Sequence, residues 1–171
     1  EGGIKTPMIM TWKNKIKSNT QFDGFISALD IFKTSLEASS VNKEYMVNAD
    51  GKNIMNYLND NDVKNENLFW RKDKMATVRS GDYKLIRLND TSTVLYNIKK
   101  NYFEDFDLKI NESQVHDSLL KLLSSWENTL IDPNWIENKN WNIVTEMIYE
   151  DLMTNRDIRA LSPKDLNNSV K

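Results

Sequence analysis

Hydrophobic positions in the first sixty residues predict one strand followed by two helical segments. Residues 7–12 form a short apolar run between a Gly-Gly turn and a Lys/Asn-rich stretch, a pattern typical of a buried strand. Residues 22–36 place apolar side chains at steps of three and four, which predicts a helix whose apolar face covers a sheet. Residues 54–58 predict one or two further helical turns, after the turn pair Asp50-Gly51.

The pattern changes to short strands between residues 67 and 98. Four β-rich runs are separated by polar loops of two to four residues, which predicts antiparallel hairpins in a meander sheet. These runs are 67–71, 74–79, 83–88 and 93–98. The polar stretch 59–67 before them is the best candidate for a linker.

Helical spacing returns after residue 110. Apolar residues line one face from Val115 to Leu130, and Asp132-Pro133 ends the segment. Asn111, with Gln114 three residues later, has the form of a capping box. We expect this helix to pack on one side of the sheet. Residues 143–152 predict one more short helix, and residues 156–171 read as a polar tail.

Composition limits the class of protein. The 171 residues allow one domain or a piece of a larger one, since domains run to about 100–200 residues. Six Phe, five Trp and six Tyr provide for a packed core. The net charge is −2 with both signs interspersed, which argues against nucleic-acid and membrane-surface roles. No apolar stretch reaches the roughly 18 residues of a membrane span.

Catalytic and metal-binding patterns are scarce. The absence of cysteine excludes disulfides, thiolate zinc sites and a cysteine nucleophile. The single histidine, His116, lies off the apolar face of its helix, so we expect it to be exposed and without a catalytic role. The run 59–62 is rich in Asn and Asp, but it lacks the Gly and final Glu of a calcium loop and is better interpreted as a solvated linker. We predict no catalytic residue and no metal ligand.

Six elements, occurring in the family's order, resemble the sulfatase family. Glu1-Gly2-Gly3, with a Pro, an apolar run and a Trp after it, is similar to the family's Glu-Gly-Gly motif. Residues 29–34 resemble its Asp-Leu-Phe-Pro-Thr helix start, and residues 50–54 its Asp-Gly-x-x-Leu turn. The elements similar to the family's C-terminal subdomain are 68–71, 78–86, and 95–98 with Glu104 and Leu108 at the family's spacing.

The resemblance implies the C-terminal portion of an arylsulfatase-like sulfuric ester hydrolase of the alkaline-phosphatase superfamily. In that family a formylglycine, made from the first residue of a Cys/Ser-x-Pro/Ala-x-Arg motif, is the nucleophile and calcium polarises the sulfate oxygens. The motif does not occur in these 171 residues. We therefore expect formylglycine and calcium in a preceding N-terminal part, no cofactor here, and no activity from this segment alone.

The resemblance also sets the expected fold class and domains. We expect an α+β chain with a small four-stranded antiparallel sheet packed against a C-terminal helix, preceded by the last strand and helix of a larger α/β domain. Residues 1–62 would be the edge of that domain, 63–155 the C-terminal subdomain, and 156–171 the tail. Apolar surface left exposed by residues 2–58 would favour dimerisation or rearrangement of the isolated segment.

The subdomain would flank the mouth of the active site and help to select the leaving group. Trp70, Arg71 and Lys74 are the candidate substrate contacts, because an aromatic ring can stack on a sugar and cations can pair with a second anionic group. The alternative is that Trp70 is a core residue and the cations are solvated hairpin ends. Family-motif residues with a structural role would be Glu1, Gly2, Gly3, Arg79 and Lys84.

The expected partners are the N-terminal α/β domain of the same protein and a sulfated carbohydrate or aryl sulfate, with no nucleic acid and no membrane segment. Family habit favours a periplasmic or secreted protein. Two alternatives stay open: a non-catalytic binding module, and part of a phosphodiesterase or phosphotransferase of the same superfamily.

Overall fold

Two units make up the chain, Gly2–Leu68 and Phe69–Lys171. The structure is a computed structural model and describes residues 2–39, 44, 49–59, 67–89 and 91–167. Most of the predicted linker 59–67, and Glu1 of the Glu-Gly-Gly motif, lie outside the described residues.

Helix α1 (Ala28–Ala38) begins six residues later than the apolar spacing predicts. Ser27 is its N-cap, and a capping box forms because the Asp30 carboxylate accepts the Ser27 N–H at 2.8 Å. Phe22, the first residue of the apolar pattern, instead stacks on Tyr57 with ring centroids 6.1 Å apart. The prediction of helix at 22–27 is therefore wrong. Phe22 is apolar because its ring packs on Tyr57, not because it lies on the apolar face of a helix.

The strand predicted at residues 7–12 is also wrong. These residues have no regular secondary structure, and the Ile9 side chain is 93 % exposed. A strand is defined by hydrogen bonds to a neighbouring strand, and no strand of the described structure pairs with this run. The exposed apolar surface that we expected between residues 2 and 58 is present, on Met8, Ile9, Leu29, Ile31 and Phe32.

Helix α2 (Ile54–Asn59) confirms the predicted turns at 54–58 and is tied to α1 by two buried side chains. Asp30 accepts the Lys52 N–H at 2.8 Å, and the Thr34 hydroxyl accepts the Ile54 N–H at 2.8 Å. Gly51, directly before Lys52, has φ +86°. It lies so close to α1 that an added Cβ would meet the Leu29 carbonyl at 2.5 Å. The two family-like motifs of this unit therefore form one hydrogen-bonded structure.

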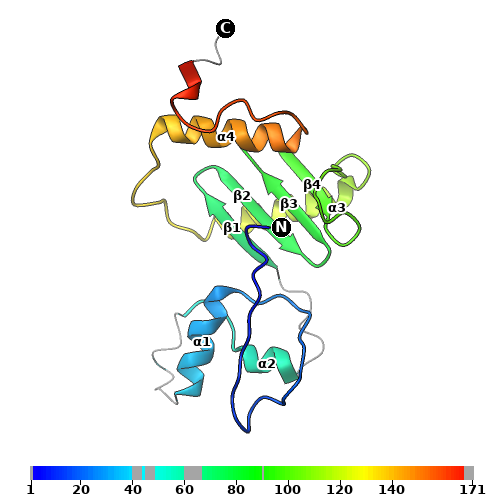
Figure 1. The fold of residues 1–171 in the computed structure, drawn as a ribbon, viewed down its shortest axis with the longest axis vertical. Coiled ribbons are helices and arrows are strands. Elements are labelled where there is room, and N and C mark those ends of the chain that lie inside the picture. Colours follow the sequence, from blue (N-terminus) through cyan, green and yellow to red (C-terminus); the bar gives the residue numbers. More distant parts are fainter. Residues whose placement is uncertain (1, 40–43, 45–48, 60–66, 90, 168–171) are drawn as a thin grey trace. The chain divides into compact units, whose positions relative to one another are not determined.

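The C-terminal unit is built on a four-stranded antiparallel meander, as predicted (Figure 1). Its strands follow chain order and each lies within one residue of its predicted bounds. They are β1 (Leu68–Lys72), β2 (Met75–Ser80), β3 (Tyr83–Arg87) and β4 (Thr93–Asn97). Register is fixed by the buried row in which Val78 of β2 faces Leu85 and Leu85 faces Leu95 of β4.

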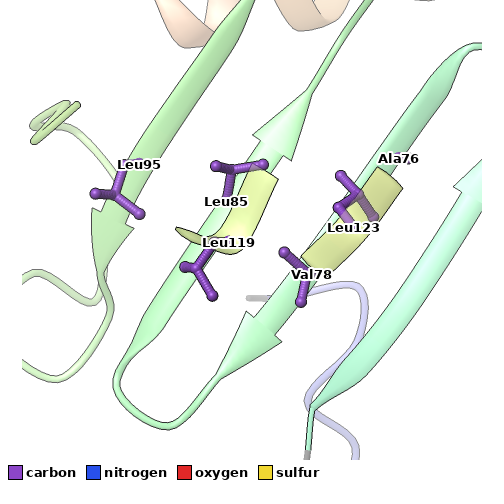
Figure 2. Close-up of a cluster of buried hydrophobic side chains, with 6 residues drawn as sticks. All are labelled: Ala76, Val78, Leu85, Leu95, Leu119 and Leu123. Carbon is purple, nitrogen blue, oxygen red and sulfur yellow. The ribbon is translucent and has the colours of Figure 1, made fainter. Parts of the chain in front are cut away.

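Helix α3 (Ser113–Glu127) covers one face of this sheet. Figure 2 shows Leu119 and Leu123 over a cluster of buried side chains from the strands, namely Ala76, Val78, Leu85 and Leu95. Burying these aliphatic side chains supplies about 1.5–3 kcal/mol each for the larger ones. The predicted packing of a helix on one side of the sheet is confirmed.

The ends of α3 differ from the prediction. No capping box forms at Asn111, because the N-cap is Glu112 and its side chain makes no cap hydrogen bond. The Glu112 carboxylate accepts a hydrogen bond from the Tyr83 hydroxyl instead. The helix ends at Glu127 rather than Leu130, and the backbone continues in turns over residues 128–130.

Helix α4 (Lys139–Met153) is longer than the predicted segment 143–152. It begins early because Asn138 caps it, accepting the Asn140 N–H at 2.9 Å. Met153 packs against a second cluster, Val94, Tyr96 and Ile98, whose side chains alternate with Leu95 and so lie on the sheet face opposite α3.

Residues after α4 are organised around one buried carboxylate. Asp151, fully buried, accepts the Arg159 backbone N–H at 2.9 Å and the Arg159 Nε at 2.7 Å. A short 3-10 helix, η3 (Asp165–Asn167), follows. The segment predicted as a polar tail therefore contains ordered structure between residues 156 and 167.

Candidate functional site

The turn between β1 and β2 carries one of the three predicted substrate contacts, Lys74, and the other two, Trp70 and Arg71, lie on β1. Asp73 adopts φ +50° in this turn, and Arg71 Nε donates to its carbonyl at 3.1 Å. Arg87 Nη2 donates to the Lys74 carbonyl at 3.2 Å from the neighbouring strand. The Lys74 side chain is exposed at the tip of this anchored turn.

Arg87 fixes the turn to helix α3 through an ion pair with Glu127. Both guanidinium nitrogens are used, Nη1 to Oε2 at 2.6 Å and Nη2 to Oε1 at 2.7 Å. Such a planar two-point contact defines direction as well as distance. The tip of the hairpin is thereby held at a set position relative to the sheet and α3.

Trp70 and Arg71 point to opposite faces of the sheet. Phe69 stacks on Trp126 of α3 at 4.9 Å, so it lies on the α3 face. Because side chains alternate along a strand, Arg71 shares that face and Trp70 takes the other, where it is half-buried. The structure therefore does not bring Trp70, Arg71 and Lys74 together as one cluster.

A polar cluster lies where the β1–β2 turn meets the start of α4. Lys72 pairs with Glu137 at 3.0 Å. With the Asn142 amide oriented so that its nitrogen faces the two carboxylates, it donates to Glu137 at 2.7 Å and to Asp73 at 3.0 Å. We call Lys72, Asp73, Glu137 and Asn142 the hairpin–helix cluster. The sequence analysis did not predict this cluster. The sequence feature that marks the region is the presence of Trp135 and Trp141 among Asn and Lys residues.

The family-motif cation Lys84 is buried and paired. Its Nζ lies 2.6 Å from Glu104 Oε1, and the two side chains are 8 % and 19 % exposed. Burial raises the pKa of Glu104, the hydrogen bond and charge of Lys84 lower it, and the resulting pKa is below its ordinary value of 4.5. Arg79 faces Lys84 across the β2–β3 pair. Gly2 and Gly3 are exposed in a turn of the N-terminal unit.

His116 is less exposed than predicted, with 15 % of its side chain accessible. Nε2 lies 3.0 Å from the Thr93 hydroxyl and Nδ1 lies 3.0 Å from Asp117. The Thr93 contact connects the start of α3 to β4. The prediction of an exposed histidine is wrong because the first turn of α3 packs beside the first residue of β4.

Within 2–39, 44, 49–59, 67–89 and 91–167, no three His, Cys, Asp or Glu side chains gather as metal ligands would. In the same ranges, every helix is too short or too polar to cross a bilayer.

Comparison with known proteins supports the predicted resemblance. Over 71 residues the chain is 34 % identical to the uncharacterized sulfatase YdeN of Escherichia coli, a match that covers 40 % of this chain and 12 % of that protein. No protein-family model matches the chain. The similarity to a sulfatase in sequence is therefore confirmed over part of the chain.

The fold has solved counterparts. The crystal structure of Ps i-CgsB in complex with k-i-k-neocarrahexaose matches 85 % of this chain with a TM-score of 0.63 at 19 % identity. A second structure of Ps i-CgsB matches 82 % with the same TM-score at 20 % identity. The chain spans about a third of each, 34 % and 33 %. The α+β fold is shared with these proteins.

Proposed function

We propose that this chain is the C-terminal part of an arylsulfatase-like sulfuric ester hydrolase that acts on a sulfated carbohydrate or an aryl sulfate. The observation that carries the proposal is its 34 % identity to a sulfatase over 71 residues. The packing of the family-like motifs supports it. Asp30 and Thr34 of one family-like motif accept the backbone N–H groups of Lys52 and Ile54 in the next, so the two motifs form one structure.

In this proposal the β1–β2 hairpin contributes to recognition of the leaving group. Trp70 offers an aromatic face on one side of β1, and Lys74 offers an exposed ammonium at the turn. The turn's rigidity, set by Arg87 and Glu127, favours recognition because little ordering is needed when ligand binds. Arg71, which bonds to the Asp73 carbonyl, orders the turn in this scheme.

The chemistry itself is assigned to other residues of the complete protein. The resemblance implies that a formylglycine supplies the attacking hydroxyl and that a calcium ion stabilises charge on the sulfate oxygens. These 171 residues contain neither cysteine nor the formylglycine motif. We therefore propose that the chain acts together with an N-terminal α/β domain and releases no sulfate by itself.

The test is release of free sulfate by the complete gene product. A panel of sulfated oligosaccharides, including the k-i-k-neocarrahexaose that the solved neighbour holds, would be incubated with the protein beside chemically desulfated controls. Sulfate release from at least one sulfated member supports the proposal. No release from any carbohydrate or aryl sulfate, combined with hydrolysis of phosphate esters, would assign the chain to a phosphate-specific enzyme of the superfamily instead.

A further inference from the structure

Helix α1 has the reverse of the usual distribution of side chains on a surface helix. Its buried residues are polar, since Asp30 and Thr34 are 4 % and 5 % exposed. Its large apolar residues Leu29, Ile31 and Phe32 are 57 %, 48 % and 60 % exposed. A helix at a protein surface normally buries its apolar stripe and presents charged residues to water. The outward side of α1 is therefore suited to burial rather than to contact with water.

The spacing along α1 separates its two sides. Residues at steps of three, four and seven lie on one side of an α-helix. Asp30, Thr34 and Glu37 follow this spacing, and Lys33 lies at the border of the same side. Every charged residue of α1 is thereby accounted for. The outward side is uncharged and carries Leu29, Ile31, Phe32, Ser35 and Leu36.

Helix α3 of the C-terminal unit has the ordinary arrangement. It buries Leu119 and Leu123 against the sheet. It presents the polar side chains of Lys121 and Ser124 to solvent. Helix α1, in contrast, is held within its own unit by hydrogen bonds from its polar side. The apolar side that normally attaches a helix to its domain is thus available for a further contact.

The chemistry of the outward side of α1 limits what can cover it. The side is uncharged, and its one hydroxyl, that of Ser35, donates to the Ile31 carbonyl at 2.8 Å. It therefore offers no cation to the sulfates of a sugar or to the phosphates of a nucleic acid. An apolar protein surface fits, because burying both surfaces is favourable and leaves no polar group without a partner.

The size of this side argues against a second copy of the chain as the occupant. Helix α1 has 11 residues and is about 16 Å long. Each partner in a stable dimer contributes roughly 20–30 residues, far more than one side of such a helix supplies. One short helix with an apolar side is instead typical of a layer that covers the core of a larger domain.

The solved counterparts contain further polypeptide that supplies room for such a core. The match to the Ps i-CgsB complex covers 85 % of this chain, which is more than the C-terminal unit Phe69–Lys171 contains. The shared fold therefore includes part of the N-terminal unit. Because the matched region is 34 % of that solved chain, this fold occurs there together with a much longer stretch of other polypeptide.

We propose that the outward side of α1 docks on an apolar surface of the N-terminal α/β domain of the complete protein. The inference rests on the proposed function for the existence of that domain, and it adds which side of which helix makes the contact. Asp30 and Thr34 hold α1 against the turn at residues 51–54, so the apolar side chains are presented before docking. Little ordering of α1 is then needed when the contact forms.

Thiol labelling of the complete protein tests this docking surface. Ser35→Cys places a thiol of similar size on the outward side of α1. Ser124→Cys is the matched control, because Ser124 is also an exposed helical serine whose hydroxyl donates to the carbonyl four residues earlier, at 2.9 Å. Labelling is read on the peptide that contains each position, so other thiols of the complete protein do not interfere.

The expected result differs between the complete protein and the 171-residue chain. In the complete protein, Ser35→Cys should be labelled about a hundredfold or more slowly than Ser124→Cys, because the docked domain excludes the reagent. In the 171-residue chain, the two variants should be labelled at rates within about threefold of each other.

Equal labelling of the two variants in the complete protein would overturn the docking surface. Protection of Ser35→Cys that appears in the 171-residue chain as its concentration rises would identify a second copy as the occupant. Protection there at every concentration would identify the C-terminal unit, and either result would overturn the proposal. Protection in the complete protein together with no sulfate release would overturn the proposed function and leave the docking surface standing, whereas sulfate release with equal labelling would do the reverse.

Discussion

The carboxylate of Asp30 in α1 accepts the backbone N–H of Lys52, 22 positions later, at 2.8 Å. The same carboxylate caps the helix through the Ser27 N–H. Burial of Tyr57, together with the charge of Asp30 and a hydrogen bond to it, raises the pKa of Tyr57 to about 12. The buried Asp30 side chain thus caps the N-terminus of α1, holds the turn at Lys52 and interacts with the Tyr57 hydroxyl.

Thr34→Val should loosen the turn that leads into α2. The substitution keeps the branched shape but removes the hydroxyl oxygen that accepts the Ile54 N–H, leaving a buried donor unsatisfied at a cost of about 1–3 kcal/mol. Hydrogen exchange at the Ile54 amide should accelerate accordingly. Ser35→Ala is the control, since that exposed hydroxyl donates to the Ile31 carbonyl of its own helix. Unchanged protection of the Ile54 amide in the Val variant would contradict the assignment.

Gly51→Ala should destabilise the same unit. A Cβ at this position meets the Leu29 backbone at 2.5 Å and the backbone has φ +86°, so the variant should lose about 1 kcal/mol or more. Tryptic cleavage after Lys52 should become about fivefold faster or more. Gly3→Ala, where an added Cβ meets nothing within 4 Å, should leave this cleavage rate unchanged. Equal rates in both variants would show that Gly51 is not constrained.

Arg87→Met should destabilise the C-terminal unit far more than Lys99→Met. Arg87 and Glu127 are 18 % and 13 % exposed, so removing the cation leaves a mostly buried carboxylate and should cost about 2–3 kcal/mol. The Lys99–Asp82 pair is exposed, with 3.6 Å between its charged atoms, and should contribute less than about 0.5 kcal/mol. Urea unfolding followed by tryptophan fluorescence measures both. Similar losses would mean that the Arg87 contact does not anchor the hairpin.

Stability should fall on the acid side through Glu104. Because its pKa in the folded chain lies below 4.5, the Lys84 contact contributes fully above that pH and is lost as the pH falls through the lower, folded-state pKa. Glu104→Gln should therefore be less stable than the parent at pH 6, and the difference should shrink as the pH falls below 4.5. Urea midpoints measured between these conditions check this. A difference that stays constant with pH would contradict the pairing.

The four strands could be predicted because each β-rich run is bounded by a short polar turn, a local signal that tertiary contacts did not override. The irregular backbone of residues 7–12 and the late start of α1 at Ala28 could not be predicted, because strand pairing and the Phe22–Tyr57 stack are contacts between distant residues. The spacing of apolar residues in these two segments is compatible with a helix, a strand or an exposed irregular run, so it does not distinguish between them.

The candidate site shows the same division. Trp70, Arg71 and Lys74 could be placed on one hairpin from the sequence, and strand alternation then separates Trp70 from Arg71. The hairpin–helix cluster could not be predicted, because Asp73 and Asn142 approach each other only once α4 packs beside the sheet. The spacing of residues along the chain does not indicate a contact between residues as far apart in sequence as Asp73 and Asn142.

Sulfate-ester hydrolysis is tested most directly by the kcat/KM of the complete protein on a matched pair of substrates, an aryl sulfate and the corresponding aryl phosphate. The pair shares one leaving group and differs in the atom attacked and in the charge of the ester, so the ratio reports the reaction class independently of leaving-group recognition. We predict a preference for the sulfate ester of about a hundredfold or more, equivalent to about 2.7 kcal/mol in transition-state stabilisation. A clear preference for the phosphate ester would contradict it.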